Sequence, residues 1–319
     1  MSFKGAKLVW HNGQMIPWKE ATVHVMTHAL HYGSSVFEGI RVYKTSKGLK
    51  TFRLTDHIQR LFNSALIYRI EIPYEQLTLV EVCKKVILAN ELMKGAYIRP
   101  IVFRGLGNVG LVPKENDPIN VSIAAWEWGP YLGANALEKG VDVCVSSWQR
   151  VAPNTLPALA KAGGNYLSSQ LISAEAKRLG FAEGIALDTN GMVSEGAGEN
   201  LFIIRDKQIY TPPSASSILT GITRDSVMQL ASQLNLKVRE ELIPREMLYL
   251  ADEAFFTGTA VEITPIRSVD RIKIGQGHRG PITKQLQDIF FGLFNGDTED
   301  NHGWLEDLDE NLADSTSHI

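Results

Sequence analysis

Short segments with strand character, joined by turns rather than long crossovers, constrain the fold of this chain more than any other feature. Before residue 130, segments rich in β-branched and aromatic residues predict strands at 7–11, 21–25, 39–43, 51–54, 97–104 and 120–126. Two helices interrupt them, one from about Thr55 with its apolar residues on one stripe and one over 75–93. The N-terminal part is therefore predicted to be an α+β unit.

A second sheet is predicted after the hinge-like segment G-P-Y-L-G-A-N, which begins at Gly129. The strand-like segment 141–148 starts this sheet, Asn165 can cap a helix that Gly180 ends, and Asn190 with Gly191 predicts a tight turn. Further helices are predicted from near Thr220 and from Pro281, before an acidic tail without Lys or Arg.

The chain is long enough for two domains, because 319 residues exceed the usual size of one hydrophobic core. We predict a small N-terminal domain at 1–130, a linker at 131–140, a larger C-terminal domain at 141–310 and a disordered tail at 311–319.

The charge and composition of the chain argue against some classes of partner. The formal net charge is -3 and no basic stripe recurs, which argues against a nucleic-acid partner. We find no apolar run of signal-peptide or membrane-span length, and Cys83 and Cys144 lack the spacing of a zinc site or a disulfide framework. We therefore expect a cytoplasmic protein with two buried free thiols and small-molecule or protein partners.

The segment G-L-G-N-V-G at 105–110 has the spacing of a dinucleotide-binding loop, with Glu127 at the distance of a ribose-binding acid. Such a site requires a helix that starts at the last glycine and directs its N-terminus at the pyrophosphate. Pro113 and Pro118 instead bracket too few residues for that helix. The segment is therefore predicted to be a glycine-rich loop between two strands.

His24, His28 and His31 have the spacing of metal ligands on one helix face. However, Val23 and Val25 flank His24 in the alternation of a strand, and no H-E-x-x-H motif or nearby Asp completes a coordination shell. We therefore predict no metal site, and histidines that are hydrogen-bonded within a strand and a loop.

Lys161 lies in the segment A-L-A-K-A-G-G-N-Y, among alanines and glycines just before a predicted helix. The pKa of a lysine falls readily on desolvation, and a neutral amine condenses with an aldehyde. The segment therefore suggests pyridoxal phosphate as a cofactor. The alternative is a lysine that lies along the surface with its ammonium group in water.

Such an enzyme also needs a group at the pyridine nitrogen and a cradle for the phosphate. Glu195, in V-S-E-G-A-G-E-N-L-F, is flanked by small residues that admit a ring, or it is a solvated carboxylate in a turn. Gly221, Ile222 and Thr223 lie at a predicted helix start, where backbone N–H groups favour an anion. An ordinary capped helix start is the alternative.

Two further groups are candidate anion ligands. Thr259 and Ala260 lie at a strand-to-turn junction, where a hydroxyl and successive amides can bind phosphate or carboxylate, or simply form a turn. Arg60 lies opposite the apolar stripe of its helix, as either a solvated arginine or a phosphate ligand does.

Taken together, these segments resemble the class IV aminotransferases, and in particular the bacterial branched-chain amino acid aminotransferases, from about Lys7 to Leu305. The blocks with the greatest specificity are H-A-L-H-Y-G-S-S-V-F-E-G-I-R, Y-I-R-P, A-P-N-T-L-P-A-L-A-K-A-G-G-N-Y-L-S-S-Q, L-D-T-N-G-M-V-S-E-G-A-G-E-N-L-F, L-T-G-I-T-R-D and T-G-T-A-V-E-I-T-P-I. The resemblance implies fold type IV, a mixed α/β (α+β) protein with a small N-terminal α/β domain, a larger C-terminal domain with a pseudo-barrel sheet, and pyridoxal 5′-phosphate between them. Thr220 departs from the family, in which proline is common at this position, and so does the tail beyond about residue 310.

The resemblance also implies a role for each candidate residue. Lys161 is the catalytic lysine that holds the cofactor covalently, and Glu195 pairs with the pyridine nitrogen. The other implied cofactor-binding residues are Arg60, Tyr166, Leu219, Gly221, Ile222, Thr223 and Thr259. The implied activity is reversible ping-pong amino transfer between leucine, isoleucine or valine and 2-oxoglutarate, which gives glutamate.

One pocket must then accept an aliphatic chain and a γ-carboxylate. The resemblance assigns its apolar walls to Tyr32, Phe37, Val109, Trp128 and Tyr166. It assigns Tyr97, with the Thr259 and Ala260 amides, to the α-carboxylate and Arg99 to the γ-carboxylate. The loop that carries Val109 would close over a neighbouring subunit's site, so a homo-oligomer is expected, at least a dimer and potentially a hexamer.

Three other functions are weighed against this one. A D-amino acid aminotransferase of the same family would carry R-x-H where this chain has Y-I-R-P, and an aminodeoxychorismate lyase fits less well. A non-catalytic binding protein that kept the scaffold is disfavoured because Lys161 and Glu195 are both present.

Overall fold

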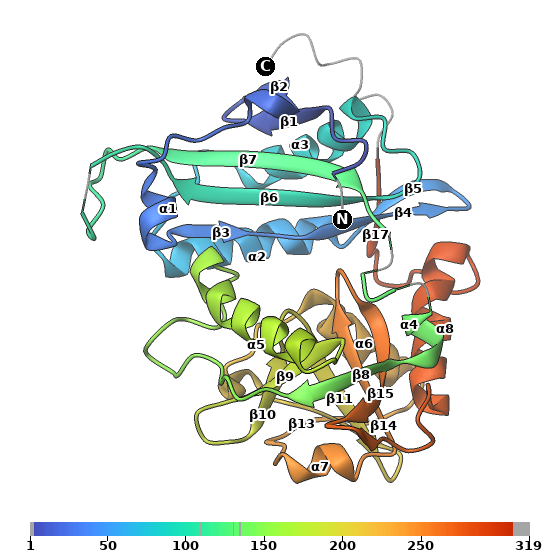
Figure 1. Cartoon of the computed structure of the whole chain (residues 1–319). Helices are drawn as coiled ribbons and strands as arrows, with labels where there is room; N and C mark the ends of the chain where they lie inside the picture. The colour runs from blue at the N-terminus through green and yellow to red at the C-terminus, as the bar shows by residue number, and fades with distance from the viewer. Residues whose placement is uncertain (1–2, 109, 130, 134, 309–319) are drawn as a thin grey trace. The chain divides into compact units, whose positions relative to one another are not determined.

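The computed structural model describes residues 3–108, 110–129, 131–133 and 135–308. The chain forms two compact units, each with one sheet (Figure 1). Unit 1 comprises Met1–Gly129, Ala160–Gly164 and Asp300–Ile319, and unit 2 comprises Pro130–Leu159 and Asn165–Glu299. Neither unit is therefore one continuous stretch of sequence, and the domain boundaries given above remain predictions.

Unit 1 contains mainly strands and two long helices. In chain order its elements are β1 (Leu8–His11), β2 (Gln14–Pro17), α1 (His28–Tyr32), β3 (Ser35–Phe37), β4 (Ile40–Thr45), β5 (Gly48–Phe52), α2 (Leu54–Ile67), α3 (Gln76–Ala89), β6 (Ala96–Arg104), β7 (Ile119–Glu127) and β17 (Leu305–Asp307), with a 3-10 turn at Trp18–Glu20.

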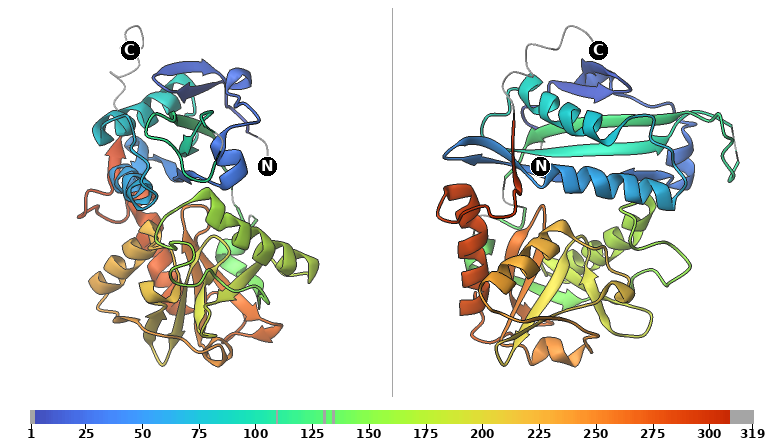
Figure 2. Two further views of the ribbon diagram at one scale, coloured as in Figure 1. Left: turned by 90° about the vertical axis from the view of Figure 1, so that its left-hand side faces the viewer. Right: turned by 180° about the vertical axis from the view of Figure 1, so that it is seen from behind.

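The sheet of unit 1 is antiparallel, in the order β17-β5-β4-β6-β7-β1-β2, with β3 also paired to β6. Helices α2 and α3 lie on the same face of it (Figures 1 and 2). Leu54, Ile58 and Leu61 of α2 are fully buried against this sheet, which fixes the helix and so positions the polar residues on its other faces.

The predicted strand at 21–25 is wrong: these residues are irregular and exposed, and α1 follows them. The alternation around His24 reflects no buried face, because Val23 and Val25 are 46% and 73% exposed. The predicted strand at 51–54 is the end of β5, after which Arg53 has a positive φ of 53° and α2 begins. Strands β2 and β3 were not expected: β3 has only three residues, too few to show a period, and β2 is a four-residue strand that ends in a proline.

The glycine-rich segment 105–110 lies in a loop between β6 and β7 with no helix among its described residues, as expected. Asp117 organises this loop: its carboxylate accepts hydrogen bonds from the backbone and side chain of Asn108 (2.9 and 2.8 Å) and the Lys114 N–H (2.8 Å). These bonds lower the pKa of Asp117 to about 2. Gly107 is needed there, because a Cβ atom would lie 2.4 Å from an Asp117 oxygen.

Unit 2 has a mixed sheet with helices around it. Its elements are α4 (Ala136–Lys139), β8 (Val141–Val145), α5 (Tyr166–Arg178), β9 (Glu183–Leu187), β10 (Val193–Gly196), β11 (Asn200–Arg205), β12 (Gln208–Thr211), α6 (Ile222–Gln233), β13 (Val238–Glu240), α7 (Glu246–Tyr249), β14 (Glu253–Gly258), β15 (Glu262–Val269), β16 (Ile272–Lys273) and α8 (Pro281–Asn295), with 3-10 turns at Gly163–Asn165, which begins in unit 1, and Ser214–Ser216.

The strand order in unit 2 is β10-β9-β8-β15-β14-β11-β12-β13, with β16 paired to β15. The β8 pairs with β9 and β15 and the β12–β13 pair are parallel, and the others are antiparallel. Helix α5 lies on the side of this sheet that faces the viewer in Figure 1. Helix α6 lies on the side that faces the viewer in the right-hand view of Figure 2. The predicted turn at Asn190 and Gly191 is confirmed, since Gly191 has a φ of 79° between β9 and β10.

Strand β17 is the last element within the described residues. Strand β17 pairs with β5, and the Glu306 carboxylate accepts hydrogen bonds from the N–H and hydroxyl of Thr55, both at 2.8 Å, at the start of α2. The predicted disordered tail at 311–319 lies outside the described residues. The predicted linker at 131–140 contains the short helix α4.

The remaining general expectations concern cysteines and membranes. Cys83 and Cys144 are both free and buried, as predicted, and burial raises the pKa of both thiols, that of Cys144 to about 11. Within the described part of the chain, every helix is too short or too polar to cross a membrane.

Candidate active site

The Lys161 segment packs as part of unit 1, although its neighbours on both sides along the chain belong to unit 2. The Lys161 N–H donates to Ser64 Oγ on α2 (3.0 Å), and its carbonyl accepts the Phe37 N–H on β3 (3.0 Å). A further isolated bridge joins Val36 to Ala162. These backbone contacts hold the lysine at the edge of a packed sheet, and its Nζ lies 5.1 Å from the centre of the Phe37 ring.

Arg99 on β6 is enclosed by aromatic rings rather than by acids. Its Cζ lies 4.8 Å from the ring centre of Phe37, 5.3 Å from Tyr97 and 5.9 Å from Trp126. Its Nη2 donates to the Tyr97 hydroxyl (3.2 Å), but its Nε is buried without a hydrogen-bond partner in the described structure. A partly buried guanidinium in this state is costly, which points to an anion that completes its donor set.

Tyr97 and Trp128 form one wall near Arg99. Their rings stack at 4.6 Å with an angle of 26°, and Tyr97 lies so close to Gly39 that a Cβ atom there would be 1.8 Å from the tyrosine oxygen. The structure therefore brings together Lys161, Phe37, Tyr97, Arg99 and Trp128 in unit 1.

Arg60 is not a solvated arginine, and this alternative is excluded. Its Nε and Nη2 bind the two oxygens of Glu38 at 2.6 and 2.9 Å, and its side chain is only 13% exposed. His57 Nδ1 lies 2.7 Å from the same carboxylate. Burial raises the pKa of Glu38, but the charge of Arg60, with the contacts of His57, outweighs this effect and lowers it.

In unit 2, Glu195 is a buried and fully paired carboxylate, not a solvated one. It is 5% exposed, lies 2.8 Å from Arg150 and accepts hydrogen bonds from Asn200 Nδ2 (3.0 Å) and the Leu219 N–H (3.1 Å). Asn200 also donates to the Leu219 carbonyl (2.8 Å), so one amide ties the carboxylate to the segment before α6. Glu195, the residue predicted to pair with the pyridine nitrogen, is thus held in place by three partners.

Helix α6 begins at Ile222, with Gly221 at its N-cap and no side-chain cap. Gly221 is required by a close approach, because a Cβ atom would lie 2.1 Å from Asn200 Oδ1. The first backbone N–H groups of α6 therefore lie beside the Glu195 network, next to the buried Thr223. This donor set fits a phosphate.

The turn 259–260 lies at the end of the sheet where Asn200 begins β11. Thr257 pairs with Asn200 in the β14–β11 register, so Thr259 and Ala260 follow at the same end of the sheet. The Thr257 hydroxyl is itself buried without a hydrogen-bond partner among the described residues. Tyr166 starts α5, three residues before Ser169, whose Oγ lies 3.5 Å from Arg150 Nη1.

Two predicted pocket residues are not placed with these groups. Tyr32 lies at the end of α1, is 42% exposed and packs on His28 (4.5 Å). Val109 lies outside the described residues.

The histidines near α1 serve the local structure. His28 Nδ1 and Nε2 lie 2.7 Å from Ser34 Oγ and 3.0 Å from the Gly110 carbonyl, and His31 Nε2 lies 2.9 Å from the Val25 carbonyl. Hydrogen bonding was predicted, but two of the three lie in a helix rather than in a strand and a loop. Within the described residues no group of three or more His, Cys, Asp or Glu could hold a metal ion.

Sequence reasoning missed the residues that orient the predicted ones. Glu38, Arg150 and Asn200 each contact a candidate residue, and His57 contacts Glu38. Each of these four residues is far from its partner in sequence or appears in a segment with a different apparent role. Only Glu38 and Asn200 carried a signal, since they lie in the blocks F-E-G-I-R and G-E-N-L-F that contain candidate residues or adjoin them.

Comparisons with known proteins agree with this geometry. A family model described as Amino-transferase class IV matches residues 35–269. The Escherichia coli (strain K12) protein named branched-chain-amino-acid aminotransferase is 55% identical over 310 residues, which are 97% of this chain and 100% of that protein. A crystal structure of an Escherichia coli branched-chain amino acid aminotransferase has a TM-score of 0.94 at 56% identity, over 95% of this chain and 99% of that one.

A third relative is the branched-chain amino acid aminotransferase of Thermobaculum terrenum, solved in its PLP-form (holo-form). It has a TM-score of 0.88 at 35% identity and covers 95% of this chain and 98% of that one. The chain therefore belongs to the class IV aminotransferase family, and it is a transferase. The resemblance and the fold class that the sequence predicted are both confirmed.

Proposed function

We propose that this chain is a branched-chain amino acid aminotransferase, which moves the amino group of leucine, isoleucine or valine to 2-oxoglutarate with pyridoxal 5′-phosphate as cofactor. The carrying observation is Arg99, a guanidinium enclosed by Phe37, Tyr97 and Trp126, without an acidic partner among the described residues. Its surroundings suit an aliphatic side chain, and its charge suits the γ-carboxylate of glutamate. The named relatives support the same substrates, and the PLP-form of one of them supports the cofactor.

The residues described above fit the cofactor. When bound, pyridoxal 5′-phosphate supplies an aldehyde that takes up amines and a ring that withdraws electrons from the substrate α-carbon. Lys161 would hold it covalently through Nζ, and after the substrate amine has replaced Nζ in that bond, the freed lysine amine would move the proton of the substrate α-carbon. The Glu195 carboxylate would hold a proton at the ring nitrogen, while Tyr166 and Leu219 contact the ring.

The phosphate would be bound by Arg60, by the N–H groups at Gly221, Ile222 and Thr223, and by Thr259. The α-carboxylate of the substrate would be bound by Tyr97 with the amides of Thr259 and Ala260. Tyr32, Phe37, Val109, Trp128 and Tyr166 would exclude water and contact the aliphatic chain.

The rival activities make different demands on the same strand. A D-amino acid aminotransferase would carry R-x-H where β6 has Y-I-R-P, and this arrangement of Tyr97 and Arg99 favours the branched-chain activity. A non-catalytic protein would have no need of the paired Glu195 or of a lysine fixed through its backbone by Ser64 and Phe37.

The test is a transamination assay of the purified full-length chain with leucine and 2-oxoglutarate, and separately with D-alanine. We expect glutamate and 4-methyl-2-oxopentanoate from leucine and no product from D-alanine. The Lys161→Ala variant should lose transamination while it keeps the wild-type far-UV circular dichroism spectrum, because no other amine replaces Nζ. Activity of this variant within about tenfold of wild type, or preference for D-alanine, would refute the assignment.

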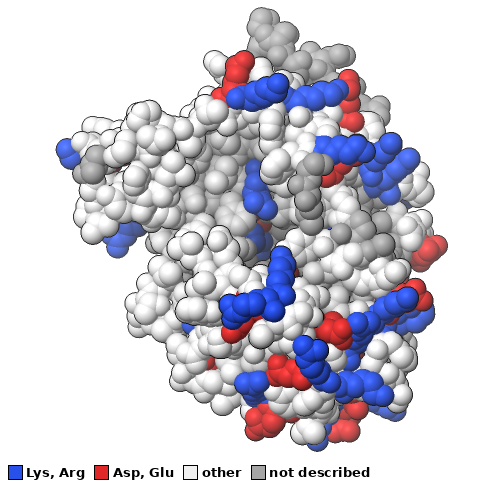
Figure 3. Space-filling model, viewed as in Figure 1, with Lys and Arg blue, Asp and Glu red and all other residues white. Residues whose placement is uncertain are grey.

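We also propose that the chain acts in the cytoplasm as a homo-oligomer of at least two copies. The free, buried thiols of Cys83 and Cys144 support the location. Leu106, Leu111 and Val112 in the β6–β7 loop are 51%, 80% and 84% exposed. The projecting part of unit 1 at the left of Figure 3 carries few charged side chains.

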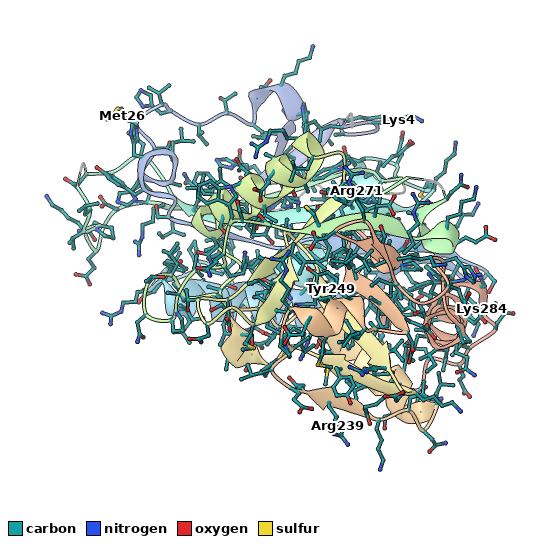
Figure 4. The ribbon with its side chains drawn as sticks, turned by 60° about the horizontal axis from the view of Figure 1, so that its bottom comes forward. Lys4, Met26, Arg239, Tyr249, Arg271 and Lys284 are labelled. Carbon is teal, nitrogen blue, oxygen red and sulfur yellow. The ribbon has the colours of Figure 1, made fainter. Side chains whose placement is uncertain are left out.

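The loop before α1, together with α1 itself, adds to this apolar surface. Val25 and Leu30 are 73% and 62% exposed, and Met26 extends outward from its loop (Figure 4). Apolar side chains gathered in this way support burial by a second copy. Sedimentation velocity of the purified chain checks this proposal, and a monomer at micromolar concentration would contradict it.

A further inference from the structure

The Glu38 carboxylate is the most deeply buried acidic group of unit 1 near Lys161. It is 0% exposed and receives hydrogen bonds from Arg60, His57 and the Gly39 N–H, the last at 3.2 Å. A buried carboxylate is costly unless such partners surround it, and replacement by an apolar side chain of similar volume is often neutral for stability. Stability alone therefore gives little reason for this charge.

The geometry of the contact indicates what Glu38 does to Arg60. Both carboxylate oxygens are engaged, one by Nε at 2.6 Å and one by Nη2 at 2.9 Å. A guanidinium has five N–H donors in a fixed fork, so a contact through the edge formed by Nε and Nη2 leaves Nη1 and the second hydrogen of Nη2 directed away from Glu38. The carboxylate thus fixes both the position of the arginine and the direction in which it presents its outer donors.

The same helix also holds the lysine segment. Ser64 lies one turn after Arg60 on α2 and accepts the Lys161 N–H at 3.0 Å, and Phe37, which precedes Glu38, donates to the Lys161 carbonyl at 3.0 Å. Arg60 and Lys161 are therefore fixed relative to one another through α2 and β3.

From this network we propose that Glu38 is a positioning residue for the cofactor phosphate: it acts through Arg60 and sets the selectivity of the chain for the phosphorylated cofactor. This inference rests on the proposed function. Glu38 itself would touch neither the cofactor nor the substrate. The hydrogen bond between His57 Nδ1 and the Glu38 carboxylate would prevent that carboxylate from rotating away from Arg60.

The test compares the dissociation constants of pyridoxal 5′-phosphate and of pyridoxal, which lacks the phosphate, for the full-length cofactor-free chain and its variants. Absorbance titration measures both constants without any need for activity. In Glu38→Gln, the amide keeps one acceptor and cannot hold both Nε and Nη2. We expect affinity for pyridoxal 5′-phosphate to fall about tenfold or more and affinity for pyridoxal to change by less than about threefold.

Two further variants distinguish a loss of Arg60 positioning from a general loss of structure. Glu253→Gln is the control, because Glu253 is another buried carboxylate, in unit 2, whose partners are the Ile282 and Thr283 N–H groups and the Thr283 hydroxyl. It should leave the ratio of the two constants unchanged. In an Arg60→Lys background, which removes the bidentate contact, Glu38→Gln should cause no further loss.

Equal changes for both ligands in Glu38→Gln, no change, or full additivity with Arg60→Lys would overturn the inference. If Glu38→Gln does not fold, Glu38→Asp gives the same comparison, since the shorter carboxylate keeps the charge but cannot reach both nitrogens. A wild-type chain that fails to bind pyridoxal 5′-phosphate would instead overturn the proposed function, and this outcome is distinct because it appears before any variant is made.

Discussion

At the scale of single residues, the sequence identified the groups that carry chemistry better than the groups that orient them. Lys161 and Glu195 could be proposed because small neighbours surround them in the sequence itself. Arg150 and His57 could not be proposed, because their value comes from contacts with Glu195 and Glu38 that only the folded chain creates. A paired charge and a solvated charge look alike in a sequence.

The Glu195→Gln variant tests the ring-nitrogen role. Without a carboxylate at this nitrogen, the ring should be a poorer electron acceptor, and removal of the α-proton of leucine should slow on the order of 10²-fold. Stopped-flow absorbance in a single turnover with leucine measures this rate. The cofactor should remain bound, and an unchanged rate would contradict the role.

The substitution also leaves Arg150 beside a neutral group, so the thermal midpoint should be recorded in parallel. Gln at position 195 can still accept from Asn200 or the Leu219 N–H, which limits the structural loss. A slow rate with a midpoint within a few degrees of wild type would locate the defect in the chemistry.

The Arg99→Gln variant should separate the two half-reactions. Leucine has no γ-carboxylate, so its half-reaction should change little, whereas glutamate would have to bury a carboxylate without its charge-assisted partner. The expected loss for glutamate is about 2 to 5 kcal/mol of binding free energy, or more than tenfold in affinity. Stopped-flow measurement of each half-reaction tests this difference, and parallel losses would indicate a structural role only.

At the scale of elements, long helices and paired long strands were predictable, and short strands were not. The stripe of Ile58, Leu61 and Ala65 predicted α2, and Pro281 predicted the start of α8, which ends before Gly296 with its φ of 87°. The alternation around His24 wrongly predicted a strand, because the two valines that flank His24 are exposed and face no core. Strand β3 has three residues, too few to show a period.

Helix α8 has an N-terminus that depends on a distant residue. The Glu253 carboxylate accepts the Ile282 and Thr283 N–H groups at 3.0 and 2.8 Å, and Gly280 leaves room for it, since a Cβ atom there would lie 2.1 Å from the carboxyl carbon. Glu253→Gln should therefore lower the free energy of unfolding of unit 2 by about 1 to 3 kcal/mol. Urea unfolding followed by circular dichroism checks this value, and a loss below about 0.5 kcal/mol would show that the cap is not needed.

At the scale of the whole molecule, the family and the fold class followed from several long sequence blocks in order, and the comparisons confirmed both. Two domains were expected, but the membership of the two units was not, because residues 160–164 join unit 1 across the intervening stretch 130–159 and strand β17 joins it across 165–299. Hydrophobic pattern and turn signals are local, so they carry no information on such pairings.

Stability should decrease on acidification through the buried pair of His57 and Glu38. Burial lowers the pKa of His57 below its ordinary value of 6.5, so the unfolded chain binds a proton there that the folded chain does not. This contribution is fully present above about pH 6.5 and is lost as the pH falls through the folded-state pKa. The pKa of Glu38 is also lowered, from 4.5, so its contribution is lost at still lower pH.

The measurement is the thermal midpoint of the chain between about pH 7.5 and about pH 5.5, for wild type and for His57→Gln. The variant lacks the titrating imidazole, so its midpoint should fall less over this range than that of wild type. Equal falls in both proteins would show that other groups dominate the acid sensitivity.

The points at which the chain passes between the units have a consequence for recombination between related genes. The chain passes between them at 129–130, 159–160, 164–165 and 299–300, so unit 1 is encoded by three separate stretches of the gene. A chimera of two related genes keeps the contacts of β3 with the lysine segment, and of β5 with β17, only if all three stretches come from one parent. Exchange of the whole interior stretch 130–299 therefore separates Lys161 from the sheet against which it evolved, whereas an exchange that spares 160–164 does not.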